Sequence, residues 1–299
     1  MIFLDGVGLG SPSPVNPLST QDLPSLRRLG KGASWTADLE EQSTRRHVIR
    51  RIDATLGVEG LPQSGTGQAS LFTGVNCAAI AARHYGPFPH STSRPVIAAQ
   101  NVYMRLQAAG VSTRDLCFAN AYPDRFFSYI RATNRWTVTT LCCHTAGVPL
   151  LERDDLAAGR AVAANLTGEG WPGDPAIPRT NEKAAASALV SLALANRFTL
   201  FEYYLTDKAG HGRPGAPPDV ILDSLDRFLQ AVMTSLPDDI VLLVTSDHGN
   251  LEDVSTRGHT RNEVPFVAYG PSADAFAGVR SLLDVTPTIV TYLTEYKVT

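Results

Sequence analysis

The stretch I-V-L-L-V-T-S-D-H-G-N, residues 240–250, decides most about the fold of this chain. An uninterrupted apolar run is typical of a strand that is covered on both faces of a sheet. Asp247 and His248, an acid and an imidazole, follow this run almost at once. Because ligands of open α/β sheets collect where strands end, the stretch predicts a buried strand with a polar site at its carboxyl end.

Further apolar runs and helical patterns extend this prediction over much of the chain. Strands are expected at residues 2–4, 47–52, 198–205, 240–245 and 264–269. Helices are expected at residues 181–196, 219–236 and 282–293, where apolar residues recur at helical spacing or Ala and Leu dominate. The alternation of strands and helices predicts an α/β fold with a mostly parallel sheet flanked by helices.

Acids and imidazoles also lie after or before other predicted strands. Asp5 ends the run I-F-L-D, Asp207 and His211 bound D-K-A-G-H, and His259 lies in the loop before residues 264–269. Each pair alone is a weak signal, but strand ends at one edge of a sheet would bring them together. Carboxylate oxygens and imidazole nitrogens suit two divalent cations, Mn²⁺ or Zn²⁺. The candidate ligands are Asp5, Asp207, His211, Asp247, His248 and His259.

The segment Q-S-G-T-G-Q, residues 63–68, predicts a tight turn that opens a helix. A hydroxyl group at a helix N-terminus lies in a positive field among free N–H groups, which favours alkoxide or phosphate oxygens. Taken alone, Ser64 or Thr66 would be interpreted as a helix cap. Beside a candidate pair of metal ions, a nucleophile is the better interpretation of one of these two hydroxyls.

The order of these motifs resembles that of the alkaline phosphatase superfamily, and most closely its branch of cofactor-independent phosphoglycerate mutase and phosphopentomutase. The mutase segment N-S-E-V-G-H is similar to Q-S-G-T-G-Q at the serine and at the second glycine. The mutase motif D-x-x-G-H matches residues 207–211, and its motif D-H-G-N is unchanged at residues 247–250. The resemblance implies an alkaline-phosphatase-like fold and favours Ser64 over Thr66 as the nucleophile. It also implies one metal ion bound by Asp207, His211 and His259, and a second bound by Asp5, Ser64, Asp247 and His248.

The chain departs from this family pattern in three respects. Gln68 stands where the mutase has a histidine, and the interval between Ser64 and Asp207 is too short for the large phosphoglycerate-handling domain of the mutase. The chain also contains no C-x-P-S-R or S-x-P-S-R, the sulfatase signature, so sulfate esters are disfavoured.

Residues 79–180 differ in character from the segments on either side. They are rich in loop-forming residues and contain none of the candidate ligands. We therefore expect a catalytic core formed by residues 1–78 and 181–299, with residues 79–180 inserted as a smaller cap domain. Each arginine of this cap is a candidate substrate contact, but each one alone is more typical of a solvated surface. They are Arg94, Arg114, Arg125, Arg131, Arg135, Arg153 and Arg179.

The composition is that of an ordinary globular protein. The chain has 299 residues, of which 43% are hydrophobic, and a formal net charge of −3. This charge provides no electrostatic signal for nucleic acid or an anionic membrane, and no apolar run reaches the ~20 residues that span a bilayer. We expect a cytoplasmic protein whose cysteines, Cys77, Cys117, Cys142 and Cys143, are reduced and buried.

Together these patterns predict a metal-dependent phosphoryl-transfer enzyme that acts on a small phosphorylated substrate. The expected reaction is hydrolysis of a phosphate mono- or diester through a covalent phosphoserine at Ser64. The alternatives are an intramolecular phosphomutase acting on a sugar or glycerate phosphate, and a non-catalytic protein that binds metal ions. The sequence does not choose between Mn²⁺ and Zn²⁺ and leaves the oligomeric state open.

Overall fold

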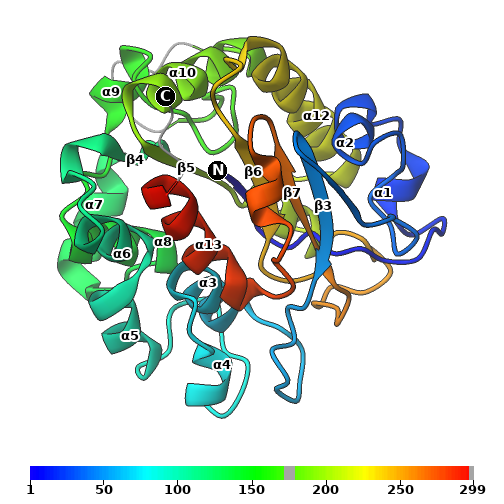
Figure 1. Cartoon of the computed structure of the whole chain (residues 1–299), viewed down its shortest axis with the longest axis horizontal. Coiled ribbons are helices and arrows are strands. Elements are labelled where there is room, and N and C mark those ends of the chain that lie inside the picture. The colour runs from blue at the N-terminus through cyan, green and yellow to red at the C-terminus, as the bar shows by residue number, and fades with distance from the viewer. Residues whose placement is uncertain (172–178, 296–299) are drawn as a thin grey trace.

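A single seven-stranded sheet forms the centre of the molecule (Figure 1). The structure is a computed structural model that describes residues 1–171 and 179–295. The strand order is β2-β3-β7-β6-β1-β5-β4. The strands are β1 Ile2–Leu4, β2 Gln42–Thr44, β3 His47–Ile52, β4 Leu116–Phe118, β5 Phe198–Tyr203, β6 Leu242–Ser246 and β7 Val264–Tyr269.

The sheet is mixed, and most of its strands run in one direction. β1 pairs in parallel with β5 and β6, and β4 pairs in parallel with β5. β7 is antiparallel to both β6 and β3, and β2 is antiparallel to β3. Five strands, β3, β6, β1, β5 and β4, therefore point the same way, which agrees with the prediction of a mostly parallel sheet. Their carboxyl ends share one edge with the start of β7.

All five predicted strands are present, with their ends shifted by at most two residues. Apolar residues cover both faces of the central strands, as the uninterrupted runs predicted. The short strands β2 and β4 were not predicted. β2 has the polar sequence Q-S-T, and β4 has only the three residues L-C-F. Neither segment is long enough to show a strand pattern by itself.

Helices cover both faces of the sheet. They are α1 Pro17–Thr20, α2 Pro24–Leu29, α3 Ser64–Thr73, α4 Cys77–Ile80, α5 Ser93–Gln100, α6 Val102–Ala108, α7 Asp124–Thr133, α8 Val138–Ala146, α9 Arg153–Ala157, α10 Glu182–Ala195, α11 Leu205–Gly210, α12 Pro218–Ser235 and α13 Leu282–Glu295. The three predicted helices correspond to α10, α12 and α13. α10 begins where the Asn181 side chain accepts a hydrogen bond from the Ala184 N–H, and α12 begins at a proline, both typical helix starts.

Two hydrophobic clusters lie on opposite faces of the sheet. One contains side chains of α2, α10 and α12, and the other contains side chains of α3 and α13 (Figure 1). Successive residues of β1 divide between them: Phe3 belongs to the α3 cluster, whereas Ile2 and Leu4 belong to the α12 cluster. This is the alternation that a strand buried on both faces requires.

Residues 79–180 pack against this sheet. They provide β4, which pairs with β5 at one edge of the sheet, and helices α5, α6 and α8, whose side chains join the cluster of α3 and α13. Residues 79–171 and 179–180, the described part of this segment, thus contribute an edge strand and no central strand. Its division from the rest of the chain as a cap domain stays a prediction.

Two expectations from composition can be compared with the structure. All four cysteines are free and buried, as expected for reduced thiols. Among residues 1–171 and 179–295, no helix combines the length and the apolar character needed to cross a bilayer.

Candidate metal centre

The predicted ligands come together at the carboxyl edge of the sheet. Asp5 follows β1 directly, Asp247 follows β6 directly, and Asp207 lies in α11, which begins just after β5. Ser64 is the first residue of α3, and His259 lies in the loop that leads into β7. Parallel strand ends and the start of one antiparallel strand meet here, so residues far apart in sequence become neighbours.

One group surrounds the imidazole of His248. Its Nε2 lies 2.9 Å from Ser64 Oγ, 3.3 Å from Asp5 Oδ1 and 3.5 Å from Asp247 Oδ2. Asp247 and His248 are fully buried, while Asp5 and Ser64 keep 8% and 7% of their surface exposed. Only the serine and Asp5 can therefore be reached from outside.

A second group surrounds the carboxylate of Asp207. Its Oδ1 lies 3.4 Å from His211 Nε2 and 3.5 Å from His259 Nε2, and the two Nε2 atoms are 3.1 Å apart. The groups adjoin, because the rings of His248 and His259 stack with their centroids 3.8 Å apart. The donor atoms of Asp207, His248 and His259 lie within 4.8 Å of one another, as do those of Asp5, Asp247 and His248.

Backbone carbonyls orient two of the imidazoles. His259 Nδ1 lies 2.6 Å from the carbonyl oxygen of Pro62, and His211 Nδ1 lies 2.7 Å from that of Arg257. A carbonyl oxygen only accepts, so each Nδ1 carries a proton, and in the neutral form of each ring Nε2 then presents its lone pair to the centre. This is the usual arrangement of histidines that bind metal ions.

The polar atoms that lack partners show that divalent cations fit this centre. Asp5 Oδ1 and Asp247 Oδ2 are buried and have no hydrogen-bond partner among the described residues. Buried acceptors are rarely left unsatisfied, and buried carboxylates require a counter-charge. The donors that converge here are carboxylate oxygens, imidazole nitrogens and one hydroxyl, without a thiolate, which suits Mn²⁺ or Zn²⁺.

Burial and crowding shift the pKa values of these acids. Burial, with the nearby Asp247 carboxylate, raises the pKa of Asp5 to about 7, and burial raises the pKa of Asp247 to about 6. Burial works against the charged form of His248, but the Asp247 and Asp5 carboxylates outweigh it and raise its pKa to about 10. A cation in this centre would offset the carboxylate charges that cause these shifts.

Asp207 behaves in the opposite way. Burial opposes its ionisation, but a hydrogen bond with His259, the charge of His248 and a hydrogen bond from Asn250 lower its pKa to about 2. Asn250 Nδ2 donates to Asp207 Oδ1 over 2.7 Å. Asp207 is therefore ready to act as an anionic ligand across the whole physiological range.

The two candidate nucleophiles lie in different surroundings. Ser64 Oγ faces His248 and a cavity. The hydroxyl of Thr66 is turned toward Tyr85, whose backbone N–H donates to it over 3.0 Å, and Thr66 is fully buried. Gln68, the departure from the mutase pattern, donates from Nε2 to Asp5 Oδ2 over 3.3 Å.

A cavity of about 660 Å³ opens beside Ser64, which is the size of a small-molecule site. Asp5, Ser64 and Asp207 form part of its wall. The remaining wall consists of Gln68, Pro87, Tyr122, Pro123, Arg125, Phe126, Tyr129, Thr137, Glu202, Tyr204 and Lys208. Arg125 and Lys208 supply positive charge, and four aromatic rings supply apolar surface.

Glu202 is an acid of this cavity that was not predicted. It is only 5% exposed, and its Oε2 accepts a hydrogen bond of 2.7 Å from the Thr139 hydroxyl. Burial raises its pKa to about 8. The sequence signal for Glu202 was an acid inside the otherwise apolar run F-T-L-F-E-Y. Buried strands rarely contain a charged residue, so such an acid indicates a special role.

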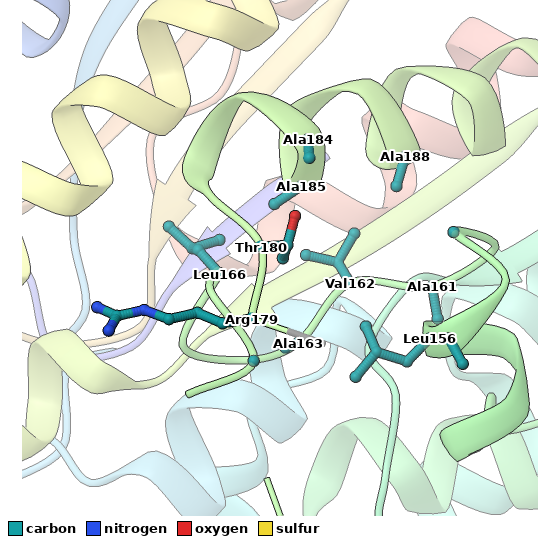
Figure 2. Close-up of a pocket in the computed structure, with 13 residues that line it drawn as sticks. Leu156, Ala161, Val162, Ala163, Leu166, Arg179, Thr180, Ala184, Ala185 and Ala188 are labelled. Atoms are coloured by element: carbon teal, nitrogen blue, oxygen red, sulfur yellow. The ribbon is translucent and has the colours of Figure 1, made fainter. Parts of the chain in front are cut away.

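Another cavity, of about 260 Å³, lies between residues 156–168 and the start of α10. Figure 2 shows that its wall is mostly small and apolar, with Val162, Ala184 and Ala188 among the side chains. None of the predicted ligands contributes to it. It therefore has no part in the chemistry of the centre.

Part of the chain is similar in sequence to known proteins. Residues 173–295 match the family model of the Metalloenzyme superfamily. The chain is 32% identical over 120 residues to a 2,3-bisphosphoglycerate-independent phosphoglycerate mutase of Thermomicrobium roseum, a match that covers 36% of this chain and 22% of the mutase. It is 31% identical over 83 residues to a phosphopentomutase of Alkaliphilus oremlandii, covering 27% of this chain and 21% of that enzyme. The matches thus span about a fifth of the length of these relatives.

Solved structures are similar over nearly the whole chain. Alkaline phosphatase from the Antarctic bacterium TAB5 superposes with a TM-score of 0.56 at 13% identity, covering 99% of this chain and 97% of the other. The PH0037 protein from Pyrococcus horikoshii gives 0.55 at 11% identity with the same coverage. At these identities the likeness concerns the fold. Residues 173–295 are thus similar to the metalloenzyme superfamily, and the chain as a whole has an alkaline-phosphatase-like fold.

Proposed function

We propose that this protein is a metal-dependent phosphoryl-transfer enzyme that hydrolyses small phosphate mono- or diesters through a phosphoserine at Ser64. The observation that carries this proposal is the position of Ser64 Oγ. It lies 2.9 Å from His248 Nε2, near Asp5 and Asp247, each of which keeps one buried oxygen without a hydrogen bond, and it faces a cavity of substrate size. A hydroxyl group with these neighbours has the surroundings of an activated nucleophile.

The residues that would hold two cations are those of the two groups around Asp207 and His248. Asp207, His211 and His259 would bind one ion, and Asp5, Ser64, Asp247 and His248 would bind the other. When bound, the cations would lower the pKa of the serine hydroxyl and offset the negative charge of the phosphoryl group. The donor set does not choose between Mn²⁺ and Zn²⁺.

The protein's own groups account for substrate binding and for the bond changes. Arg125 and Lys208 on the cavity wall attract the anionic ester. Ser64 Oγ loses its proton and forms the new bond to phosphorus, while the ester P–O bond breaks and its electron pair leaves with the alcohol oxygen. That oxygen takes up one proton, so the first half-reaction conserves charge and protons. Water then attacks phosphorus, the P–O bond to Ser64 breaks, and the serine oxygen takes up a proton. A monoester thus yields inorganic phosphate, and a diester yields a phosphate monoester.

An intramolecular phosphomutase is the second candidate. The similarity to a phosphoglycerate mutase and to a phosphopentomutase favours it. In that reaction the phosphoserine would pass its phosphoryl group to another hydroxyl of the same substrate instead of to water. A non-catalytic metal-binding protein is the third, and the complete set of converging ligands speaks against it.

The first experiment tests the nucleophile. Ser64→Ala should lower the turnover of p-nitrophenyl phosphate in the presence of Mn²⁺ or Zn²⁺ by roughly a thousandfold or more, while Thr66→Ala retains turnover. An acid quench followed by peptide mass spectrometry should find phosphate on Ser64. Phosphate on Thr66 would move the role to the threonine. Full activity of both variants would mean that water attacks the ester directly.

The second experiment identifies the acceptor of the phosphoryl group. A panel of phosphate mono- and diesters, sugar phosphates and glycerate phosphates is incubated with the metal-loaded protein, and the products are separated. Inorganic phosphate supports the hydrolase, and an isomerised phosphate ester supports the mutase. Bound metal with neither product would support the non-catalytic alternative.

A further inference from the structure

Glu252 is a buried acid at the centre of the ligand loops that the proposed chemistry does not use. It is 2% exposed, and among residues 1–171 and 179–295 no lysine or arginine forms an ion pair with it. A carboxylate in such a place is stable only if hydrogen bonds satisfy its oxygens. Its partners therefore show what it does.

Four donors satisfy the Glu252 carboxylate, one from the loop after β1 and three from the loop that joins β6 to β7. Oε2 accepts the backbone N–H of Gly8 over 2.9 Å and that of Asn250 over 2.8 Å. Oε1 accepts the side-chain amide of Asn262 over 3.0 Å and the hydroxyl of Thr260. One carboxylate thus joins the loop after β1 to the β6–β7 loop, and within that loop it connects the part that follows β6 to the part that precedes β7.

Each of these loops carries a candidate metal ligand close to the residues that donate hydrogen bonds to Glu252. Gly8 follows Asp5 by three residues, and Thr260 follows His259 directly. Asn250 lies two residues after His248, and its side chain holds Asp207 through the bond of 2.7 Å. The two groups of ligands are consequently positioned relative to each other by a single side chain that touches neither predicted ion.

Glycines leave the space that Glu252 occupies. A Cβ atom on Gly8 or on Gly249 would overlap with Glu252 Oε1, and one on Gly10 would lie 2.7 Å from its Cγ. The glycine-rich segment after Asp5 therefore accommodates a buried carboxylate. The D-H-G-N motif likewise needs its glycine for this close approach.

We propose that Glu252 is a positioning residue, whose carboxylate holds the two groups of metal ligands, around Asp207 and around His248, at fixed positions relative to each other. The proposal rests on the metal-dependent function proposed for this centre. Glutamine has the same shape, but one of its two terminal groups is an NH₂, which only donates hydrogen bonds. In Glu252→Gln this NH₂ would replace one carboxylate oxygen and would face two donors that it cannot accept from. The loops would then separate, and both ions would lose part of their coordination.

The test measures binding of Co²⁺, the probe ion, by titration calorimetry and by its visible absorption spectrum, which reports coordination geometry. Glu252→Gln should weaken Co²⁺ affinity by about 10- to 100-fold, the range seen when residues that support metal ligands are lost, and should change the spectrum. Thr260→Val removes one of the four donors and should give a smaller loss in the same direction. This variant keeps the test valid if Glu252→Gln does not fold.

Asp226→Asn is the matched control. Asp226 is also a buried carboxylate, 5% exposed, and it accepts the backbone N–H groups of Ser25 and Leu26 at a distance from the centre. Its loss should lower the melting temperature but leave Co²⁺ affinity and spectrum unchanged. Unchanged binding in Glu252→Gln, or in Thr260→Val if the first variant does not fold, would overturn the inference. An equal loss in Asp226→Asn would overturn it as well. A wild-type protein that binds no Co²⁺ would overturn the proposed function together with the inference.

Discussion

At the scale of single residues, the candidate centre gathers charge that the fold does not neutralise by itself. Asp5 and Asp247 each keep one buried oxygen without a hydrogen bond. A buried unsatisfied polar atom costs roughly 1–3 kcal/mol, and more if it is charged. Without cations, the protein can relieve this cost only by binding protons, and the raised pKa values of both acids express that response.

The stability of the metal-free protein should therefore fall as the pH rises from 5 to 8. The folded-state pKa values of Asp5 and Asp247, about 7 and about 6, lie above their ordinary value of 3.8. Protonation of these two acids therefore stabilises the folded state fully below pH 3.8, and this stabilisation is lost as the pH rises through 6 and 7. His248, raised from 6.5 to about 10, acts in the same direction at higher pH. Asp207, lowered to about 2, matters only in acid. Thermal unfolding in EDTA at several pH values measures this trend, and a melting temperature that rises across the range would contradict it.

Added Mn²⁺ should stabilise the protein more at pH 8 than at pH 5. The ligands must be deprotonated to bind, so protons compete with the ion at low pH. At a free concentration of one hundred times its dissociation constant, a ligand stabilises the folded state by about 2.7 kcal/mol. Melting curves with and without Mn²⁺ at both pH values give the comparison. An equal effect at the two pH values would show that the ion binds elsewhere.

At the scale of elements, tertiary contacts hold the start of α3 in place. Gln63, which precedes the helix, makes no capping bond with its side chain. The backbone N–H of Thr66 instead donates to the carbonyl oxygen of Tyr85 over 2.9 Å, and the N–H of Tyr85 donates to the Thr66 hydroxyl. This reciprocal pair fixes the turn that presents Ser64 to the cavity.

Thr66→Ala should cost stability without removing the chemistry. It leaves the backbone N–H of Tyr85 without its acceptor, so the free energy of unfolding should fall by about 0.5–1.5 kcal/mol, the usual contribution of one hydrogen bond. Turnover should stay within severalfold of the wild type, because the hydroxyl is turned away from the cavity. Urea unfolding and steady-state kinetics on the same preparation measure both quantities. A variant as stable as the wild type would show that the Tyr85 contact does not anchor the helix.

At the scale of the whole molecule, one hydrophobic cluster joins residues 79–180 to the rest. Leu106 of α6 and Leu141 of α8 belong to the same cluster as Phe72 of α3 and Ile289 of α13. A shared cluster couples the folding of the segments that build it, because neither side can bury its apolar surface alone.

Leu106→Ala should consequently lower the stability of the entire chain. Leu106 is fully buried, and truncating such a leucine typically costs about 2–5 kcal/mol. We expect a single calorimetric transition that moves to lower temperature, with Co²⁺ binding at 25 °C unchanged. Two transitions, of which only one moves, would instead show that residues 79–180 fold as a separate cap domain.

The sequence by itself determined the central strands, three main helices and the identity of the candidate ligands. In the apolar run at residues 240–245, residues 242–245 form a buried strand, so the local pattern was sufficient to identify it. Asp5 and Asp247 follow such runs directly, and parallel strands end at one edge. Their convergence could therefore be predicted before any distance was known.

Only the tertiary structure decided which groups touch. Ser64 and His248 are 184 residues apart, and Thr139 and Glu202 are 63 apart, so no local pattern links either pair. The short strands β2 and β4 exist only because a longer neighbour supplies their hydrogen bonds. The role of Glu252 likewise depends on the loop after β1 and both ends of the β6–β7 loop meeting at one point. Contacts between distant segments are selected by packing and by the need to satisfy buried polar atoms, which a linear pattern does not record.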